Sequence, residues 1–104
     1  MKTVAEFKRR MQVGTKVHTL YHKEFNGRTT NGEIIYKTKD LGIRPVSIVQ
    51  TTQFAFETKK TDGTTSDSWC SFPKLTDCRF EGEDTIVILD LEGSDLLTYT
   101  FVKL

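Results

Sequence analysis

From Thr15 onward the sequence consists of short β-forming runs that alternate with turn dipeptides, and this pattern leaves little room for any fold class other than mainly β. Threonine occurs sixteen times in the chain, and Val, Ile, Phe and Tyr fill many other positions of the runs, which suits a pleated surface. Asn-Gly at 26–27 and 31–32 and Asp-Gly at 62–63 are hairpin turn signals. The pattern predicts five to seven short antiparallel strands.

The first fourteen residues follow a helical pattern instead. Thr3 and Glu6 have the spacing of a capping box, in which each side chain satisfies the backbone N–H of the other residue. An apolar stripe follows, made of Val4, Phe7 and Met11. These features predict a short helix over about 3–13 that ends at Gly14. Because so short a helix is unstable alone, its stripe should dock on the sheet.

The strands are expected at 15–22, 46–58, 64–72, 78–81, 85–89 and 96–103. The run at 46–58 is longer than a usual strand, so a bend or bulge is expected near 50–52. Pro45 is interpreted as the first residue of that strand, a position where proline is tolerated. Residues 23–44 are interpreted as a long arm that carries two of the turn signals.

We expect a single domain over residues 1–104, with the helix at about 3–13 followed by a small barrel over about 15–104. Closure of the sheet would remove exposed strand edges, which favours an SH3-like barrel with the 23–44 arm as its long loop. An OB-like barrel is the alternative, together with a two-layer α+β sandwich.

Catalytic and metal-binding patterns are missing from the sequence. There is no G-x-S-x-G, H-E-x-x-H or Walker loop, so no catalytic residue, metal site or cofactor is predicted. His18 and His22 would lie about 13 Å apart on an extended strand, too far to share one zinc ion. Cys70 and Cys78 are interpreted as small, partly buried apolar residues, although a disulfide or a metal site remains an alternative.

Two features bear on the cellular compartment. The N-terminus has no apolar leader segment, and no apolar run approaches the roughly 20 residues that cross a bilayer. The two cysteines are then expected to be reduced. These features predict a cytoplasmic protein that has no contact with a membrane.

Charge is distributed unevenly along the chain. The net charge is only +1, but residues 1–60 carry 12 basic and 5 acidic side chains, whereas residues 61–104 carry 3 and 9. The halves therefore balance at +7 and −6, and such asymmetry indicates a charged partner. The alternative interpretation is that these charges solvate the surface and pair with one another inside the fold.

The leading functional hypothesis is a non-enzymatic module that binds nucleic acid through its basic helix and arm. Phe25 and Tyr36 of the arm could stack on exposed bases. The predicted contact residues are the cations of these two segments and of the first strand, namely Lys8, Arg9, Arg10, Lys16, Lys23, Arg28, Lys37, Lys39 and Arg44.

The alternative hypothesis is a protein-binding inhibitor or adaptor, for example one that acts on a nucleic-acid-directed host enzyme. Its predicted contacts are the acidic C-terminal half and an exposed tryptophan, represented by Trp69, Glu83, Asp84 and Glu92. Trp69 and Phe72 have opposite strand parity, so one of them can face solvent, although a packed Trp69 is favoured. A short chain without catalytic motifs is typical of an accessory protein of a phage or other mobile element.

Overall fold

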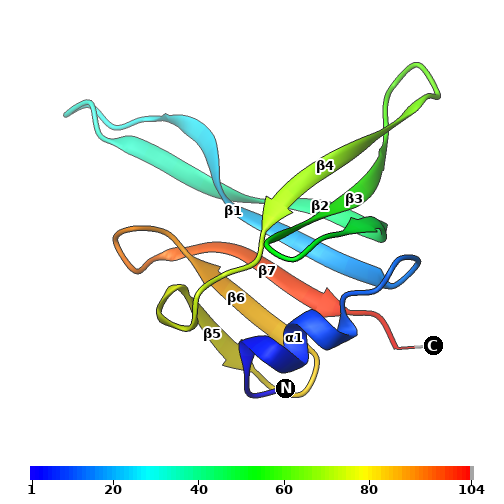
Figure 1. Cartoon of the computed structure of the whole chain (residues 1–104). Helices are drawn as coiled ribbons and strands as arrows, with labels where there is room; N and C mark the ends of the chain where they lie inside the picture. The colour runs from blue at the N-terminus through cyan, green and yellow to red at the C-terminus, as the bar shows by residue number, and fades with distance from the viewer. Residues whose placement is uncertain (104) are drawn as a thin grey trace.

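The computed structural model describes residues 1–103, which form seven antiparallel strands, one α-helix and one short 3-10 helix (Figure 1). The elements are α1 (Val4–Arg10), β1 (Lys16–Arg28), β2 (Ile34–Val49), β3 (Gln53–Lys59), β4 (Thr65–Ser71), the 3-10 helix Leu75–Asp77, β5 (Cys78–Glu81), β6 (Thr85–Leu89) and β7 (Asp95–Phe101). The strand order is β4-β3-β2-β1-β7-β6-β5. The prediction of a mainly β chain with one short N-terminal helix is confirmed.

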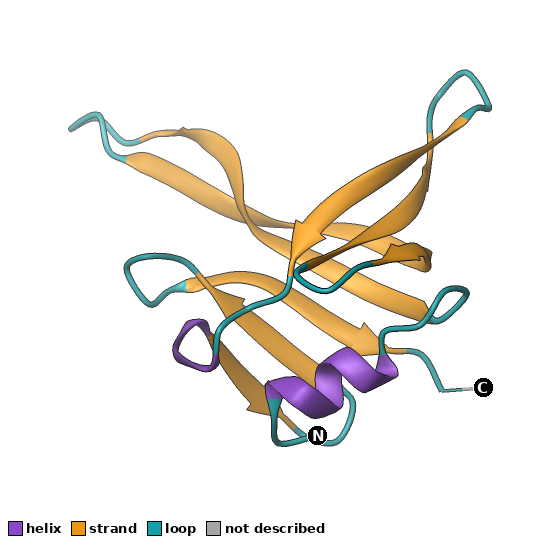
Figure 2. Cartoon of the chain, viewed as in Figure 1, coloured by secondary structure: helices purple, strands orange, loops and turns teal. Residues whose placement is uncertain are grey.

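The sheet is open, so the predicted barrel closure is not found in the described residues. β4 and β5 stand at the two ends of the strand order. After β4 the chain leaves the sheet, and the Phe72 N–H donates to the carbonyl of Thr52 before the 3-10 helix begins. Helix α1 docks beside this crossing segment (Figure 2). The helix therefore fills the side of the core that a closing strand would otherwise cover, and SH3-like or OB-like identity is not established.

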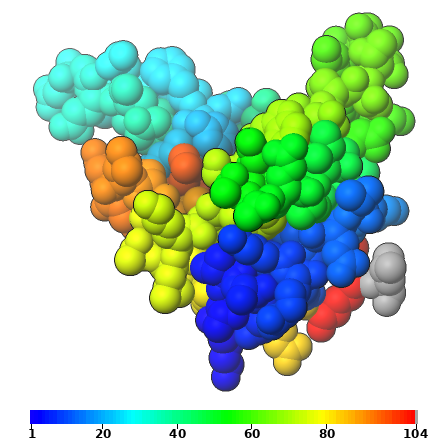
Figure 3. Space-filling view, viewed as in Figure 1, coloured from blue at the N-terminus to red at the C-terminus, as the bar shows by residue number. Residues whose placement is uncertain are grey.

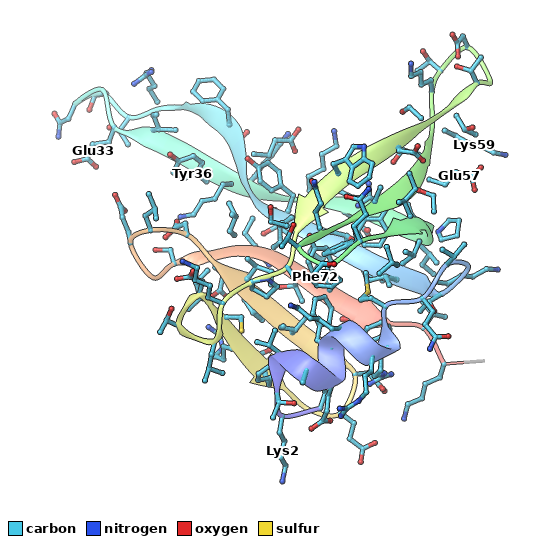
Figure 4. The ribbon with its side chains drawn as sticks, viewed as in Figure 1. Lys2, Glu33, Tyr36, Glu57, Lys59 and Phe72 are labelled. Carbon is cyan, nitrogen blue, oxygen red and sulfur yellow. The ribbon has the colours of Figure 1, made fainter. Side chains whose placement is uncertain are left out.

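The core is aromatic and is centred on the helix. Phe7 is completely buried, and its ring contacts Phe54 and Phe72 on one side and Tyr99 and Phe101 on the other, with centroid separations of 5.9–6.2 Å. Figure 4 places Phe72 between β4 and α1. One side chain of the helix thus joins the β3–β4 end of the sheet to β7.

The helix begins as the capping pattern predicts. The hydroxyl of Thr3 accepts a hydrogen bond from the Glu6 N–H at 3.1 Å. The helix is shorter than predicted, because it ends at Arg10 and Met11 is its C-cap. Gly14 therefore does not end the helix. It has a φ of 91° and lies in the turn that leads into β1.

β1 and β2 are much longer than predicted, because residues that we expected in a loop continue the ladder. Their register runs from Lys16↔Pro45 to Arg28↔Ile34. The Asn31-Gly32 turn is confirmed between the two strands. Asn26-Gly27 is not a turn: Gly27 has a φ of 94° and lies at a register shift within β1. Pro45 lies inside β2 and does not begin a strand.

The predicted single strand at 46–58 is instead a hairpin. β2 ends at Val49, and the N–H of Gln50 donates to the carbonyl of Gln53 at 2.8 Å, so the chain reverses and β3 pairs with β2. The polar residues 50–52 form this turn, which replaces the expected bulge. The Asp62-Gly63 turn, which separates β3 from β4, is confirmed, as are β5, β6 and β7 within one or two residues of the predicted strands.

Candidate interaction surface

The distal part of the β1–β2 hairpin projects from the sheet as a two-stranded ribbon. β7 pairs with β1 only as far as Tyr21, and β3 pairs with β2 only from Val46 onward. No third strand of the described chain therefore covers the ribbon between these limits. We call residues 23–44 the arm. Figure 3 shows the arm and the tip of the β3–β4 hairpin as two separate projections with a hollow between them.

The arm exposes an unusual amount of apolar surface. Ten large hydrophobic residues are exposed in the described chain, and half of them lie on the arm: Phe25, Ile34, Ile35, Tyr36 and Ile43. Ile34 and Ile35 are consecutive in β2 and are 42% and 40% exposed. Because consecutive strand residues point to opposite faces, each face of the ribbon exposes an apolar side chain to solvent.

Sequence reasoning identified only part of this surface. Phe25 and Tyr36 were considered only as side chains that could stack on exposed bases, and they lie opposite each other in the β1–β2 register, 60% and 48% exposed. The isoleucines were missed, because residues 23–44 were interpreted as a long arm of which only the cations and the two aromatic residues were considered as contacts. The Ile-Ile-Tyr run was the signal that could have identified them. It lies directly after a hairpin turn, and a strand at that place is buried only if further strands lie beside it.

Trp69 is also exposed, which differs from the favoured prediction that it packs inside the fold. It lies in β4 opposite Ala55, and its exposed fraction is 46% whereas Ala55 is fully buried. The core face of the β3–β4 hairpin is instead filled by Phe54 and Phe56. Trp69 is therefore a third exposed aromatic residue, and it lies on the other projecting hairpin.

The predicted basic contact residues do not form one continuous surface free of acidic groups. Arg10 pairs with Asp84 at 2.8 Å and lies over the Phe101 ring. On the arm, Lys23 pairs with Asp90 at 3.5 Å. Lys39 pairs with Glu24, and the other predicted cations form no ion pair within the described chain: Lys8, Arg9, Lys16, Arg28, Lys37 and Arg44.

The acidic residues predicted for protein binding are in different environments. Asp84 is mostly covered and holds both Arg10 and Lys103. Glu83 is largely exposed, and its backbone carbonyl accepts hydrogen bonds from the N-terminus and from Arg10. Glu92 is exposed in the turn between β6 and β7. The Arg10–Asp84 pair joins the basic half of the sequence to the acidic half, so part of the charge asymmetry cancels inside the fold.

The Asp84 cluster makes stability depend on pH in a definite direction. The hydrogen bond from Arg10, together with Lys103, lowers the pKa of Asp84. A carboxyl group whose pKa is lowered by folding stabilises the native state at pH values above the ordinary aspartate pKa. This stabilisation is lost as the pH falls through the lowered pKa. Asp84→Asn should therefore destabilise the protein at pH about 7 and converge with the wild type at pH about 2. The urea unfolding midpoints of the wild type and the variant at the two pH values test this prediction. The same difference in midpoint at both pH values would contradict it.

The cysteines and histidines of residues 1–103 make separate contacts. Cys70 and Cys78 are free thiols. Burial raises the pKa of Cys78, and Asp77 acts in the same direction, so this thiol is protonated at neutral pH. His18 contacts Asp40, and His22 contacts Thr38 and Thr98. No group of three potential metal ligands is found in residues 1–103.

Within the same residues, the structure contains no helix with the length and apolar character needed to cross a membrane. Comparison with protein families, with curated sequences and with solved structures finds no match to the chain. Function must therefore be inferred from the surface itself.

Proposed function

We propose that the chain is a non-enzymatic protein-binding module whose arm docks against another protein. The observation that carries the proposal is that each face of the projecting ribbon exposes an apolar side chain, with Ile34 and Ile35 exposed to 42% and 40%. An antiparallel sheet often has one face in solvent, and the side chains of that face are then polar. Apolar side chains on both faces favour a partner that covers the ribbon.

The energetics of the arm support the same proposal. A two-stranded hairpin is only marginally stable in water by itself. A partner would bury the rings of Phe25 and Tyr36, and each aromatic side chain offers about 150–250 Å² at about 25 cal/mol per Å². Such residues are typical of the few positions that supply most of the binding free energy. The isoleucines would complete the apolar centre of the interface.

Charge indicates the kind of protein surface that fits. The arm carries five cations and three carboxylates, a balance of +2. Arg28 and Lys37 are the arm cations nearest its tip, and neither forms an ion pair in the described chain. Two copies of the arm would repel each other, whereas an apolar patch surrounded by acidic residues would be complementary. We therefore propose a partner of that chemistry.

Single-stranded nucleic acid is the second candidate. Phe25 and Tyr36 lie opposite each other near Arg28 and Lys37 in the register, and aromatic rings with adjacent cations are typical of stacking sites for bases. Two observations place it second. Exposed isoleucines on both faces offer no ring for stacking, and three of the nine predicted cations already pair with carboxylates.

A capture experiment distinguishes the two candidates. Immobilised wild-type protein should retain a protein partner from cells that contain the gene, and Phe25→Ser/Tyr36→Ser should retain at least about tenfold less, the loss expected for two aromatic contacts. Leu91→Ser is the matched control, because Leu91 is fully exposed outside the arm. Equal recovery with the double variant would contradict the proposal. Loss of recovery after nuclease treatment would favour the nucleic-acid candidate instead.

A further inference from the structure

The strand β4 forms one end of the sheet, and β3 is its sole neighbour within residues 1–103 (Figure 1). Two hydrogen bonds fix which backbone groups of the hairpin face inward. The N–H of Phe72 donates to the carbonyl of Thr52, and the N–H of Lys60 donates to the carbonyl of Thr64. Both pairs continue the β3–β4 register and consist of even-numbered residues, and hydrogen-bonded pairs alternate with non-hydrogen-bonded ones. The backbone groups that point away from β3 are therefore those of the odd-numbered residues Thr65, Asp67, Trp69 and Ser71.

These outward backbone groups have no strand beside them in the described chain. The hydrogen bonds of β4 side chains leave them free, because they join the carboxylate of Asp67 to Ser47 and the hydroxyl of Ser68 to Thr58. Every odd-numbered residue of β4 is exposed. A row of four N–H and four C=O groups is a template on which one more strand can pair.

The other end of the sheet is protected against such pairing, and β4 is not. β5 has only four residues, and two of them, Arg79 and Glu81, are charged and pair with each other. Short length and charge are common devices that keep a further strand away from an edge. β4 has seven residues in unbroken register with β3, and it contains no lysine, proline or bulge. The contrast favours a role for the β4 edge in binding an extended segment.

The exposed face beside this edge indicates the chemistry of that segment. Trp69 is 46% exposed, and Asp67 lies two residues before it on the same face. Asp67 is directly opposite Glu57, and like charges in that position destabilise a sheet. Lys59 is the cation of β3, but it forms no ion pair with either carboxylate in the described chain. A segment with an apolar residue and a cation two positions apart is therefore complementary.

We propose that the edge of β4 binds a basic, extended peptide segment of another protein as an additional antiparallel strand. Hydrogen bonds to the outward backbone groups supply affinity, and side chains that alternate along the added strand supply specificity. In the antiparallel direction the residue beside Trp69 comes two positions before the residue beside Asp67. The segment therefore has the order apolar-x-Arg or apolar-x-Lys. The site does not depend on docking of the arm.

A second copy of the chain is the competing occupant of this edge. The self-pairing that uses all four outward residues places Asp67 of each copy beside Trp69 of the other, so the two Asp67 carboxylates become diagonal neighbours. With Glu57 of each copy, four carboxylates gather at the junction, which disfavours self-pairing. Sedimentation equilibrium of the free chain should therefore show a monomer. A dimer that Trp69→Ser abolishes would assign the edge to a second copy and overturn the proposal.

The binding test measures the fluorescence anisotropy of a labelled peptide, Thr-Ser-Val-Thr-Arg-Ser-Thr, as the full chain is added up to about 0.5 mM. Its valine is designed to lie beside Trp69 and its arginine beside Asp67. We expect saturable binding, and replacement of the arginine by glutamate should weaken it at least about fivefold. Absence of binding would overturn the site. Equal affinity of the two peptides would overturn the assignment to a basic segment.

Backbone methylation tests whether the peptide binds as a strand. The amide groups of its valine and arginine face β4 in this arrangement, whereas those of the central threonine and the second serine face away. N-methylation of the valine and arginine should weaken binding at least about tenfold, because two hydrogen bonds are lost. N-methylation of the central threonine and the second serine is the matched control and should weaken it much less. Equal losses would overturn strand addition.

Variants of the chain connect the binding to this edge. Asp67→Lys/Glu57→Gln should reverse the preference, so that the glutamate peptide binds more tightly than the arginine peptide. Damage to the fold does not imitate such a gain. Phe25→Ser/Tyr36→Ser alters only the arm and should bind the arginine peptide as the wild type does, so the arm and the edge are tested separately. An unreversed preference in Asp67→Lys/Glu57→Gln would overturn the proposal.

Discussion

Replacing Phe7 with alanine is expected to lower the free energy of unfolding by about 3–5 kcal/mol, the usual range for removal of a buried aromatic ring. Phe7 is 0% exposed and contacts four other rings. Because the sheet does not close on itself, this ring replaces strand pairing as the link across the core. A domain of this size is stable by only about 5–15 kcal/mol in total, so the variant should be close to unfolding.

Urea titration followed by Trp69 fluorescence measures this effect. If Phe7→Ala does not fold, Phe7→Leu keeps most of the volume and should cost about 1–1.5 kcal/mol. Val13→Ala is the control, because Val13 is 69% exposed just after the helix and its loss should change stability by less than about 0.5 kcal/mol. A loss below about 1 kcal/mol for Phe7→Ala would contradict the role of α1 as the part that completes the core.

Excision of the arm tip is expected to abolish partner binding while the fold survives. Residues 25–36 can be replaced by a two-residue Asn-Gly turn, because Glu24 and Lys37 are opposite each other in the register. None of the residues of the buried core cluster lies in the excised segment. We therefore expect a change in unfolding free energy within about 1 kcal/mol, and a loss of affinity for the partner of at least about 100-fold, or 2.7 kcal/mol.

The excised variant gives two independent measurements. Circular dichroism and a urea midpoint report the fold, and a binding titration with the captured partner reports the interface. Retained binding with an intact fold would show that the arm is not the docking surface. A collapsed fold would instead contradict the description of the ribbon as a projection that the core does not need.

Local features of the fold were predictable from sequence because short-range chemistry determines them. Thr3 and Glu6 predicted the helix start, and Asn31-Gly32 and Asp62-Gly63 predicted two hairpins. Errors arose where one signal fits two structures. Asn26-Gly27 can form a turn or a bulge, and the register of the long β1–β2 ladder decides in favour of the bulge. Residues 50–52 likewise suit a bulge or a turn.

Tertiary relationships were less predictable for a physical reason. Whether the edge strands β4 and β5 pair depends on what else fills the space between them. Strand propensity does not predict that Phe7 of the helix docks in that space. The same limit applies to the candidate surface. The Ile-Ile-Tyr run predicts a strand, but whether that strand is buried depends on how many strands lie beside it. The ion pairs are a third feature that the sequence does not predict, because Arg10 and its partner Asp84 are 74 positions apart in sequence.

The most direct test of the central proposal places a photo-crosslinking phenylalanine analogue at Tyr36 in the intact chain. Irradiation in cells that contain the gene should give one discrete adduct with a second protein. The same analogue at Leu91, fully exposed in the turn after β6, should not form that adduct. No protein adduct at position 36, or equal adducts at both positions, would contradict the proposal that the arm is the protein-binding surface.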